Sequence, residues 1–247
     1  MAGHSKWANI KHRKGAQDAK RGKIFTKLIK EISVAAREGG PDPDGNPRLR
    51  LAVQNAKGQN LPKENIERAI KKATGSDAVD YAEVTYEGYG PSGVAIFLEC
   101  ATDNLNRTVS NVRSLFTKHG GSLGVNGSVD YMFERKGIFL IKKTSEMNED
   151  DITLELIDGG AEEVEFSGEY VEVTCAMDDF GNMQGKLEEQ NLEAETAELQ
   201  RIPATTVALG DEDFAKLMKL IDAFEDDDDV QKVYHNIEAS DEQLATL

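Results

Sequence analysis

Apolar residues recur at three- and four-residue spacing near the start of the chain, the period of one helix face. They predict a helix over residues 16–37. The Gly- and Pro-rich segment 39–45 ends it, and Asn46 before Pro47 is a typical N-cap followed by a first-turn proline. A third helix begins at Pro62 and ends by Gly75. We therefore expect a helical N-terminal domain over 1–78, opened by an arm over 1–15 that lacks helical periodicity.

Beyond this domain, strand-like and helix-like segments alternate. Within residues 135–202 the order is strand, helix, strand, strand, helix, strand, which is the ferredoxin-like βαββαβ unit. The six segments are 137–142, 149–157, 163–166, 170–175, 180–190 and 197–201.

The flanking residues repeat this order when they are joined. Their segments are a strand over 94–101, a helix over 107–119, a strand over 128–133, a strand over 205–209, a helix over 213–225 and a strand over 230–237. An extra strand over 81–89 leads into a turn at 90–93. We predict an α+β fold in which the module 135–202 is inserted into a split module formed by 79–134 and 203–247.

Charge is segregated along the 247 residues, whose net charge is −16. Residues 1–75 carry 17 Lys or Arg and 7 Asp or Glu, a net of +10, whereas residues 76–247 carry 12 and 38, a net of −26. Such a basic segment is the footprint of a polyanion site, most often for nucleic acid. Two alternatives are a solvated surface that keeps the protein soluble, and docking of the basic part on the acidic part of the same chain.

The candidate nucleic-acid-binding residues gather in the arm and the start of the first helix. Cations there neutralise phosphates without reading sequence. Trp7 stacks on an exposed base, or it anchors the arm to the helices. His4 and His12 lack a zinc-ligand spacing. The proposed set is Lys6, Trp7, Lys11, His12, Arg13, Lys14, Lys20, Arg21 and Lys23.

The acidic part of the sequence contains candidate helix caps and a run of acidic residues, but no recognisable set of catalytic residues. Asp103 or Asn104 caps the following helix, and Arg107 contacts phosphate or pairs with an acid. The run 225–229 places carboxylates at a helix C-terminus, against the macrodipole. Docking of the basic domain, a divalent cation or simple solvation would explain it, and we favour docking or solvation.

We expect a non-enzymatic protein without cofactor or metal, a metal-dependent nuclease being the enzymatic alternative. Cys100 and Cys175 lie in apolar runs without paired spacing, as buried thiols of a reducing cytoplasm do. No apolar run approaches the length of a membrane span, and the N-terminus lacks the apolar core of a secretory signal. We therefore expect a cytoplasmic location.

Several long motifs resemble the YebC/PmpR family over nearly the whole chain. They are MAGHSKWANIKHRKGAQDAKRGKIFTKLI, DPDGNPRLR, YEGYGPSGVAI, DNLNRTVSNVRSLFTKHGGSLGVNGSV and EDDDDVQKVYHN. The resemblance implies a three-domain protein of bacterial type, with DNA-binding transcriptional regulators as members. Members that include mitochondrial relatives act as translation factors at the ribosome, where they aid synthesis of proline-rich stretches. DNA and ribosomal RNA thus both stay open as the target, and the sequence does not give the oligomeric state.

Overall fold

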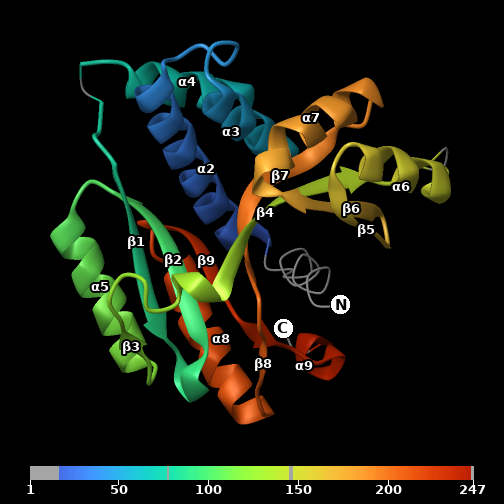
Figure 1. Cartoon of the computed structure of the whole chain (residues 1–247). Coiled ribbons are helices and arrows are strands. Elements are labelled where there is room, and N and C mark those ends of the chain that lie inside the picture. Colours follow the sequence, from blue (N-terminus) through green and yellow to red (C-terminus); the bar gives the residue numbers. More distant parts are fainter. Residues whose placement is uncertain (1–16, 77, 145–146, 246–247) are drawn as a thin grey trace.

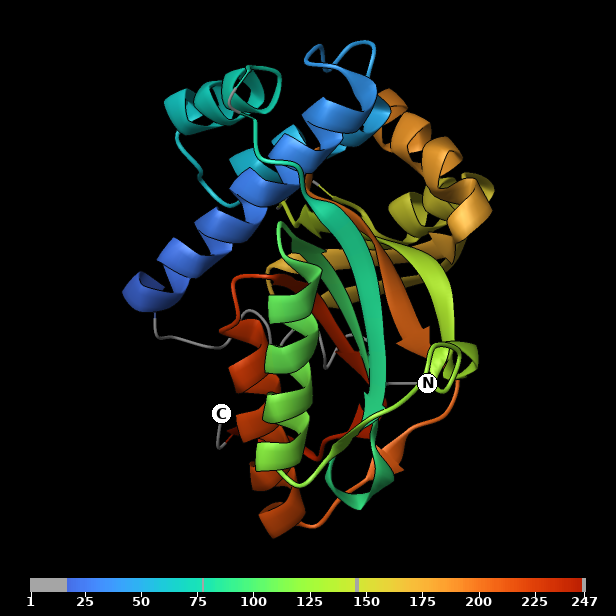
Figure 2. The same ribbon diagram turned by 90° about the vertical axis from the view of Figure 1, so that its left-hand side faces the viewer.

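The computed structural model describes residues 17–76, 78–144 and 147–245, with side chains from residue 21 onward (Figure 1). The predicted arm over 1–15 lies outside the described residues. In the described part, a helical domain sits against two sheet modules (Figures 1 and 2).

The helical domain contains α2 (Gln17–Gly39), α3 (Pro47–Gly58) and α4 (Lys63–Ala73), which confirms the three predicted helices. Asn46 caps α3 as expected, because its side-chain oxygen accepts from the Leu49 N–H at 3.1 Å. Its amide also donates to the carbonyls of Ala35 and Gly40, so one side chain joins the end of α2 to the start of α3. The core between the helices is formed by Ile32, Ala35, Ala36, Leu49, Ala52, Ala56, Leu61, Ile66, Ala69 and Ala73.

The split module has a four-stranded antiparallel sheet in the order β3-β1-β2-β9. Its strands are β1 (Ala82–Tyr89), β2 (Ala95–Thr102), β3 (Ser122–Leu123) and β9 (Val230–His235). Helices α5 (Leu105–Lys118) and α8 (Asp211–Glu225) cover one face, where Phe116 meets Phe224 edge-on at 4.8 Å between ring centroids. The short turn η1 (Pro91–Gly93) joins β1 to β2.

This sheet has the ferredoxin-like spatial order, but the chain supplies its strands differently from the prediction. The predicted strand over 128–133 is wrong: this segment forms the turn η2 (Asp130–Met132) and leads into the next module. The buried carboxylate of Glu87 accepts hydrogen bonds from the N–H groups of Gly127, Val129 and Asp130, which keeps these donors from a strand ladder. Strand β1, expected as an extra, instead fills a central position of the sheet.

The predicted strand over 205–209 is present only as β8 (Val207–Ala208). It pairs in parallel with β10 (Ile237–Glu238) in a separate two-stranded sheet, so it does not join the main sheet as expected. The short helix α9 (Asp241–Ala245) follows β10.

The inserted module follows the predicted βαββαβ order. It consists of β4 (Phe133–Lys142), α6 (Glu149–Asp158), β5 (Ala161–Ser167), β6 (Tyr170–Ala176), η3 (Met177–Asp179), α7 (Phe180–Glu189) and β7 (Ala194–Pro203). The sheet order β5-β6-β4-β7, antiparallel throughout, is that of the ferredoxin-like fold. Its core includes Phe139, which stacks on Phe180 at 4.7 Å, and the buried Cys175.

Helix α3 covers the outer edge of strand β7. The Asn55 amide donates to the Ala197 carbonyl at 2.8 Å and accepts from the Ala197 N–H at 2.9 Å, as a neighbouring strand would. The helix lies close to the strand at Gly58, where an added Cβ would lie 1.9 Å from the Glu195 carbonyl oxygen. The exposed edge of a sheet is thereby closed by the helical domain.

Candidate nucleic-acid interface

The predicted binding residues divide between the arm and the start of α2. Lys6, Trp7, Lys11, His12, Arg13 and Lys14 lie outside the described residues. Lys20 lies in the first turns of α2, and the side chains of Arg21 and Lys23 follow it on the same helix. The guanidinium of exposed Arg21 lies 5.3 Å from the ring centroid of Phe25, a cation–π contact that leaves its charge accessible.

The basic helix α2 docks on the acidic run that follows α8. Lys23 Nζ lies 2.7 Å from a carboxylate oxygen of Asp226. Two turns farther along, the buried Lys30 ammonium donates to the carbonyls of Ala101 and Asp228 and to the Asp229 carboxylate, at 3.0, 2.7 and 3.3 Å. Docking, one of the explanations left open for the run 225–229, is therefore what the structure shows.

Asp229 is the centre of this contact and is only 5% exposed. It accepts hydrogen bonds from Arg107 Nη2 at 2.7 Å and from the Thr108 hydroxyl at 2.9 Å, and it pairs with Lys30. Burial alone would raise the pKa of Asp229, but the bonds from Arg107 and Thr108 and the charge of Lys30 together hold that pKa below its ordinary value. The carboxylate is thus ionised and fully engaged at neutral pH.

Arg107 belongs to this cluster as an acid-pairing residue. Its guanidinium contacts both Asp229 and Asp103 at 2.7 Å. Asn104, rather than Asp103, caps α5, because its side-chain oxygen accepts from the Arg107 N–H at 3.0 Å. Of the two alternatives for Arg107, pairing with an acid is the one observed.

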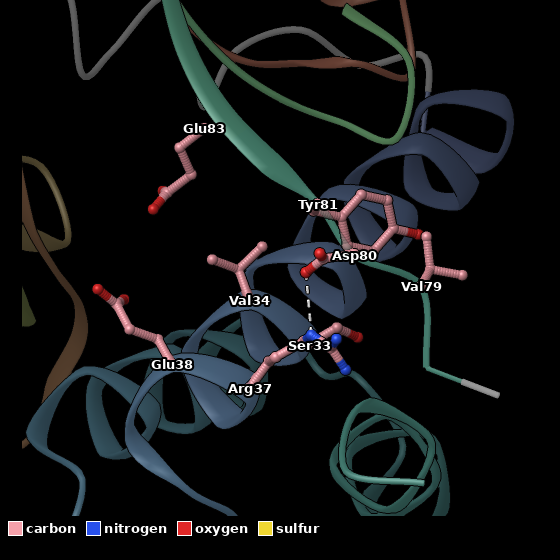
Figure 3. Close-up of a pocket in the computed structure, with 8 residues that line it drawn as sticks. All are labelled: Ser33, Val34, Arg37, Glu38, Val79, Asp80, Tyr81 and Glu83. Atoms are coloured by element: carbon pink, nitrogen blue, oxygen red, sulfur yellow. Dashed lines mark hydrogen bonds and ion pairs between the residues drawn. The ribbon is translucent and has the colours of Figure 1, made fainter. Parts of the chain in front are cut away.

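Other contacts between the helical domain and β1 are also ionic. Arg48 bridges Glu31 and Glu38 of α2 to Glu83 of β1, with distances between 2.6 and 3.0 Å. A cavity of about 260 Å³ lies beside this network, and Figure 3 shows the Arg37 guanidinium reaching across it to Asp80. Three carboxylates against one guanidinium make its lining unsuited to a phosphate. The cavity is lined by Ser33, Val34, Arg37, Glu38, Val79, Asp80, Tyr81 and Glu83.

The two thiols are buried, and the described acids form no cluster of metal ligands. Burial raises the pKa of Cys100 to about 12 and that of Cys175 to about 11, so both thiols are protonated. Within residues 17–76, 78–144 and 147–245, no three His, Cys, Asp or Glu side chains converge as metal ligands. None of the helices described there is long and apolar enough to cross a membrane.

Sequence reasoning did not find two of the residues that organise this interface. Nothing in the sequence distinguishes Lys30 from the surface cations of α2, but its side chain is buried at the junction between α2 and the split module. No motif in the sequence marks Asn55, because its partner Ala197 lies 142 residues away. Gln54 and Asn55 lie off the apolar face that Leu49, Ala52 and Ala56 form, so helical periodicity gives no signal for them.

Comparison with known proteins places these features in a family. Residues 5–76 match the TACO1/YebC protein N-terminal domain, and residues 81–237 match the TACO1/YebC second and third domain. A relative from Amoebophilus asiaticus, named "Probable transcriptional regulatory protein", is 56% identical over 96% of this chain and 98% of its own. One of the same name from Persephonella marina is 54% identical over 99% and 98%.

The fold is likewise shared with a solved structure. A conserved hypothetical protein from Aquifex aeolicus superposes with a TM-score of 0.84 at 45% identity, covering 95% of this chain and 97% of that one. The family resemblance noted in the sequence is confirmed by both kinds of comparison. This chain belongs to the TACO1/YebC family.

Proposed function

We propose that this protein is a non-enzymatic regulator of gene expression that binds nucleic acid through its basic N-terminal residues. The name shared by its relatives supports transcription as the process, and we propose DNA as the target. The observation that carries the proposal is the segregation of charge, +10 over residues 1–75 against −26 over the rest. Phosphate groups would be attracted to the first part and repelled by the second.

The acids nearest the basic helix favour a binding role over a nuclease role. A two-metal or one-metal nuclease needs free carboxylates beside its bound substrate. Asp226 and Asp229 are the acids of the run 225–229 that contact α2, and they are already bound by Lys23, Lys30 and Arg107. Their function is to hold the helical domain in place, which supports the non-enzymatic assignment.

A second candidate function is that of a translation factor bound to ribosomal RNA. It is favoured by the acidic residues that border α2, Asp226 beside Lys23 and Asp80 beside Arg37 near its end. A long straight duplex extending past α2 would meet the acidic modules. A folded RNA that presents a local group of phosphates would meet the basic residues alone.

The test is the salt dependence of binding by the full-length protein. In the variant Arg13→Gln/Lys14→Gln, the slope of log affinity against log salt should flatten by about one to two units for every target sequence. The matched control Arg135→Gln/Lys142→Gln removes an Arg and a Lys that are exposed on β4, and its slope should stay that of the wild type. Duplex DNA and a ribosomal RNA hairpin serve as probes.

The outcome separates the two candidates. Tighter binding of duplex DNA supports the transcriptional role, and tighter binding of the hairpin, with salt-sensitive co-sedimentation with ribosomes, supports the translational one. An unchanged slope in the Arg13/Lys14 variant with both probes would refute binding through the basic arm.

A further inference from the structure

Helix α5 lies in the acidic part of the chain, but the segment that contains it carries no acidic residue. Residues 76–247 hold 38 Asp or Glu among 172 residues, so a stretch of 26 would hold about six. Residues 104–129, which include all of α5, hold none, together with three Lys or Arg. Solubility does not require such a gap, because acids elsewhere on this surface are abundant.

The outward side of α5 is formed by short polar and cationic side chains. Thr108, Val112 and Phe116 are buried against the sheet. The exposed residues recur at the helical spacing on the opposite side: Ser110, Asn111, Arg113, Ser114, Thr117 and Lys118. Among the residues that the structure describes, neither Arg113 nor Lys118 has an acid as partner, so both charges are available to a ligand.

The neighbouring helix α8 provides the contrast. It packs beside α5 on the same face of the sheet (Figure 2), but it begins with three acids and ends with two more. Its Lys216 is held by Glu212 and Asp213 at 2.9 and 3.4 Å. The acid-free surface is therefore one helix wide and is bounded by carboxylates on the side of α8.

The start of α5 meets the basic helix α2 at a shared carboxylate. Arg107 in the first turn of α5 and Lys30 of α2 bind the same carboxylate, Asp229, at 2.7 and 3.3 Å. In Figure 2 the start of α5 stands directly below α2, on the same side of the molecule. A polyanion seated on the start of α2 thus passes the acidic run 226–229, in which Asp227 accepts from the Asn111 amide at 3.3 Å, before it reaches the acid-free face of α5.

We propose that the outward face of α5 is a second nucleic-acid contact, which binds the sugar–phosphate backbone of RNA. Arg113 and Lys118 take phosphates, and the hydroxyls of Ser110 and Ser114 hydrogen-bond with ribose 2′-hydroxyls, groups that both donate and accept. The 14-residue helix is about 21 Å long, enough for a few nucleotides of one strand. This inference rests on the second candidate function, binding to RNA, and extends it beyond the N-terminal residues.

The test uses the full-length variant Arg113→Gln/Lys118→Gln, titrated with a fluorescent RNA hairpin at several salt concentrations. Each lost phosphate contact flattens the salt slope by roughly 0.7 to 0.9 units, so we expect a change of about one to two units and roughly 3- to 10-fold weaker binding. The thermal midpoint should not change, because both side chains are exposed and without acid partners. The control Arg135→Gln/Lys142→Gln has the same change of charge and should bind as the wild type does.

A second variant addresses the choice of RNA. Ser110→Ala/Ser114→Ala keeps every charge, so its salt slope should equal that of the wild type while its preference for RNA over DNA of the same sequence falls about two-fold or more. Loss of RNA and DNA affinity in equal measure in this variant would overturn the assignment to RNA.

The variant Arg13→Gln/Lys14→Gln distinguishes a failure of this inference from a failure of the proposed function. If Arg13→Gln/Lys14→Gln flattens the slope and Arg113→Gln/Lys118→Gln does not, the α5 contact is refuted and the proposed function stands. If neither variant changes the slope, both are refuted.

Discussion

The ammonium of Lys23 lies 2.7 Å from a carboxylate oxygen of Asp226 and also donates to the Asp226 backbone carbonyl at 3.1 Å. Asp226 caps the C-terminus of α8, where the macrodipole disfavours a carboxylate and favours a cation. Lys23 thus offsets a local cost on α8. A phosphate that approached the start of α2 would have to compete with Asp226 for this cation.

We expect Asp226→Asn to raise nucleic-acid affinity by roughly two- to five-fold. The pair is partly exposed, so its removal releases Lys23 at a cost of about 1 kcal/mol or less. Fluorescence anisotropy at low salt measures the change. Asp178→Asn, which removes an exposed carboxylate from η3, is the control for net charge and should have a smaller effect. Equal affinities in the two variants would show that Asp226 does not compete.

We expect Asn55→Ala to lower the free energy of unfolding by about 1–3 kcal/mol. The substitution leaves the Ala197 N–H and carbonyl of β7 without their partner at a half-buried edge. Asn55→Asp should cost at least as much, because an anion would then face the Ala197 carbonyl. Calorimetry measures both, with exposed Lys57→Ala on the same helix as the reference. A loss no greater than that of Lys57→Ala would contradict the role of Asn55 in closing the edge.

The raised pKa of Glu172 predicts that the stability of the protein depends on pH. It is 8% exposed on β6, and burial, then the charges of Glu165 and Glu163, raise its pKa to about 7. Between pH 4.5 and 7 the folded protein keeps a proton that the unfolded chain releases, so stability falls as pH rises through this window. Glu172→Gln removes this dependence. The variant should therefore gain about 2 kcal/mol relative to the wild type between pH 5 and pH 8.

Urea unfolding at pH 5, 6, 7 and 8 tests this expectation. Glu169→Gln, in the exposed turn before β6, removes a carboxylate without the burial and should follow the wild type at each pH. A difference between Glu172→Gln and the wild type that is constant over pH would show that Glu172 titrates as an ordinary exposed glutamate.

We propose that the module 135–202 is separable from the rest. Phe133 and Pro203 face each other in the β4–β7 pairing, so the two ends of the insertion are adjacent and a short Gly-Ser bridge can join them. The shortened protein should unfold in one cooperative transition at a lower temperature, because Asn55 loses Ala197, and Glu99 and Asp130 lose Arg201. A broad transition without a calorimetric peak would contradict this division of the chain.

Local signals in the sequence were sufficient for most helices and for one module. The Asn46-Pro47 pair marks the start of α3, and the period of apolar residues marks α2, α5 and α8. The strands β4 to β7 follow the predicted order because each lies within a short segment of consistent periodicity. Burial of Cys100 and Cys175 was likewise evident from their apolar neighbours. These features depend on residues close together in the chain, and the sequence by itself determined them.

The arrangement of the split module was decided by tertiary structure. Periodicity shows that 82–89 is a strand, but its central place depends on pairing with both β2 and β3. The segment 128–133 does not form a strand because the Glu87 carboxylate, about 40 residues earlier, accepts hydrogen bonds from backbone N–H groups at 127, 129 and 130. The docking of Lys30 on Asp229 spans 199 residues. Which distant residues pair depends on which buried polar groups can form hydrogen bonds in the folded protein. A single sequence does not reveal these pairings.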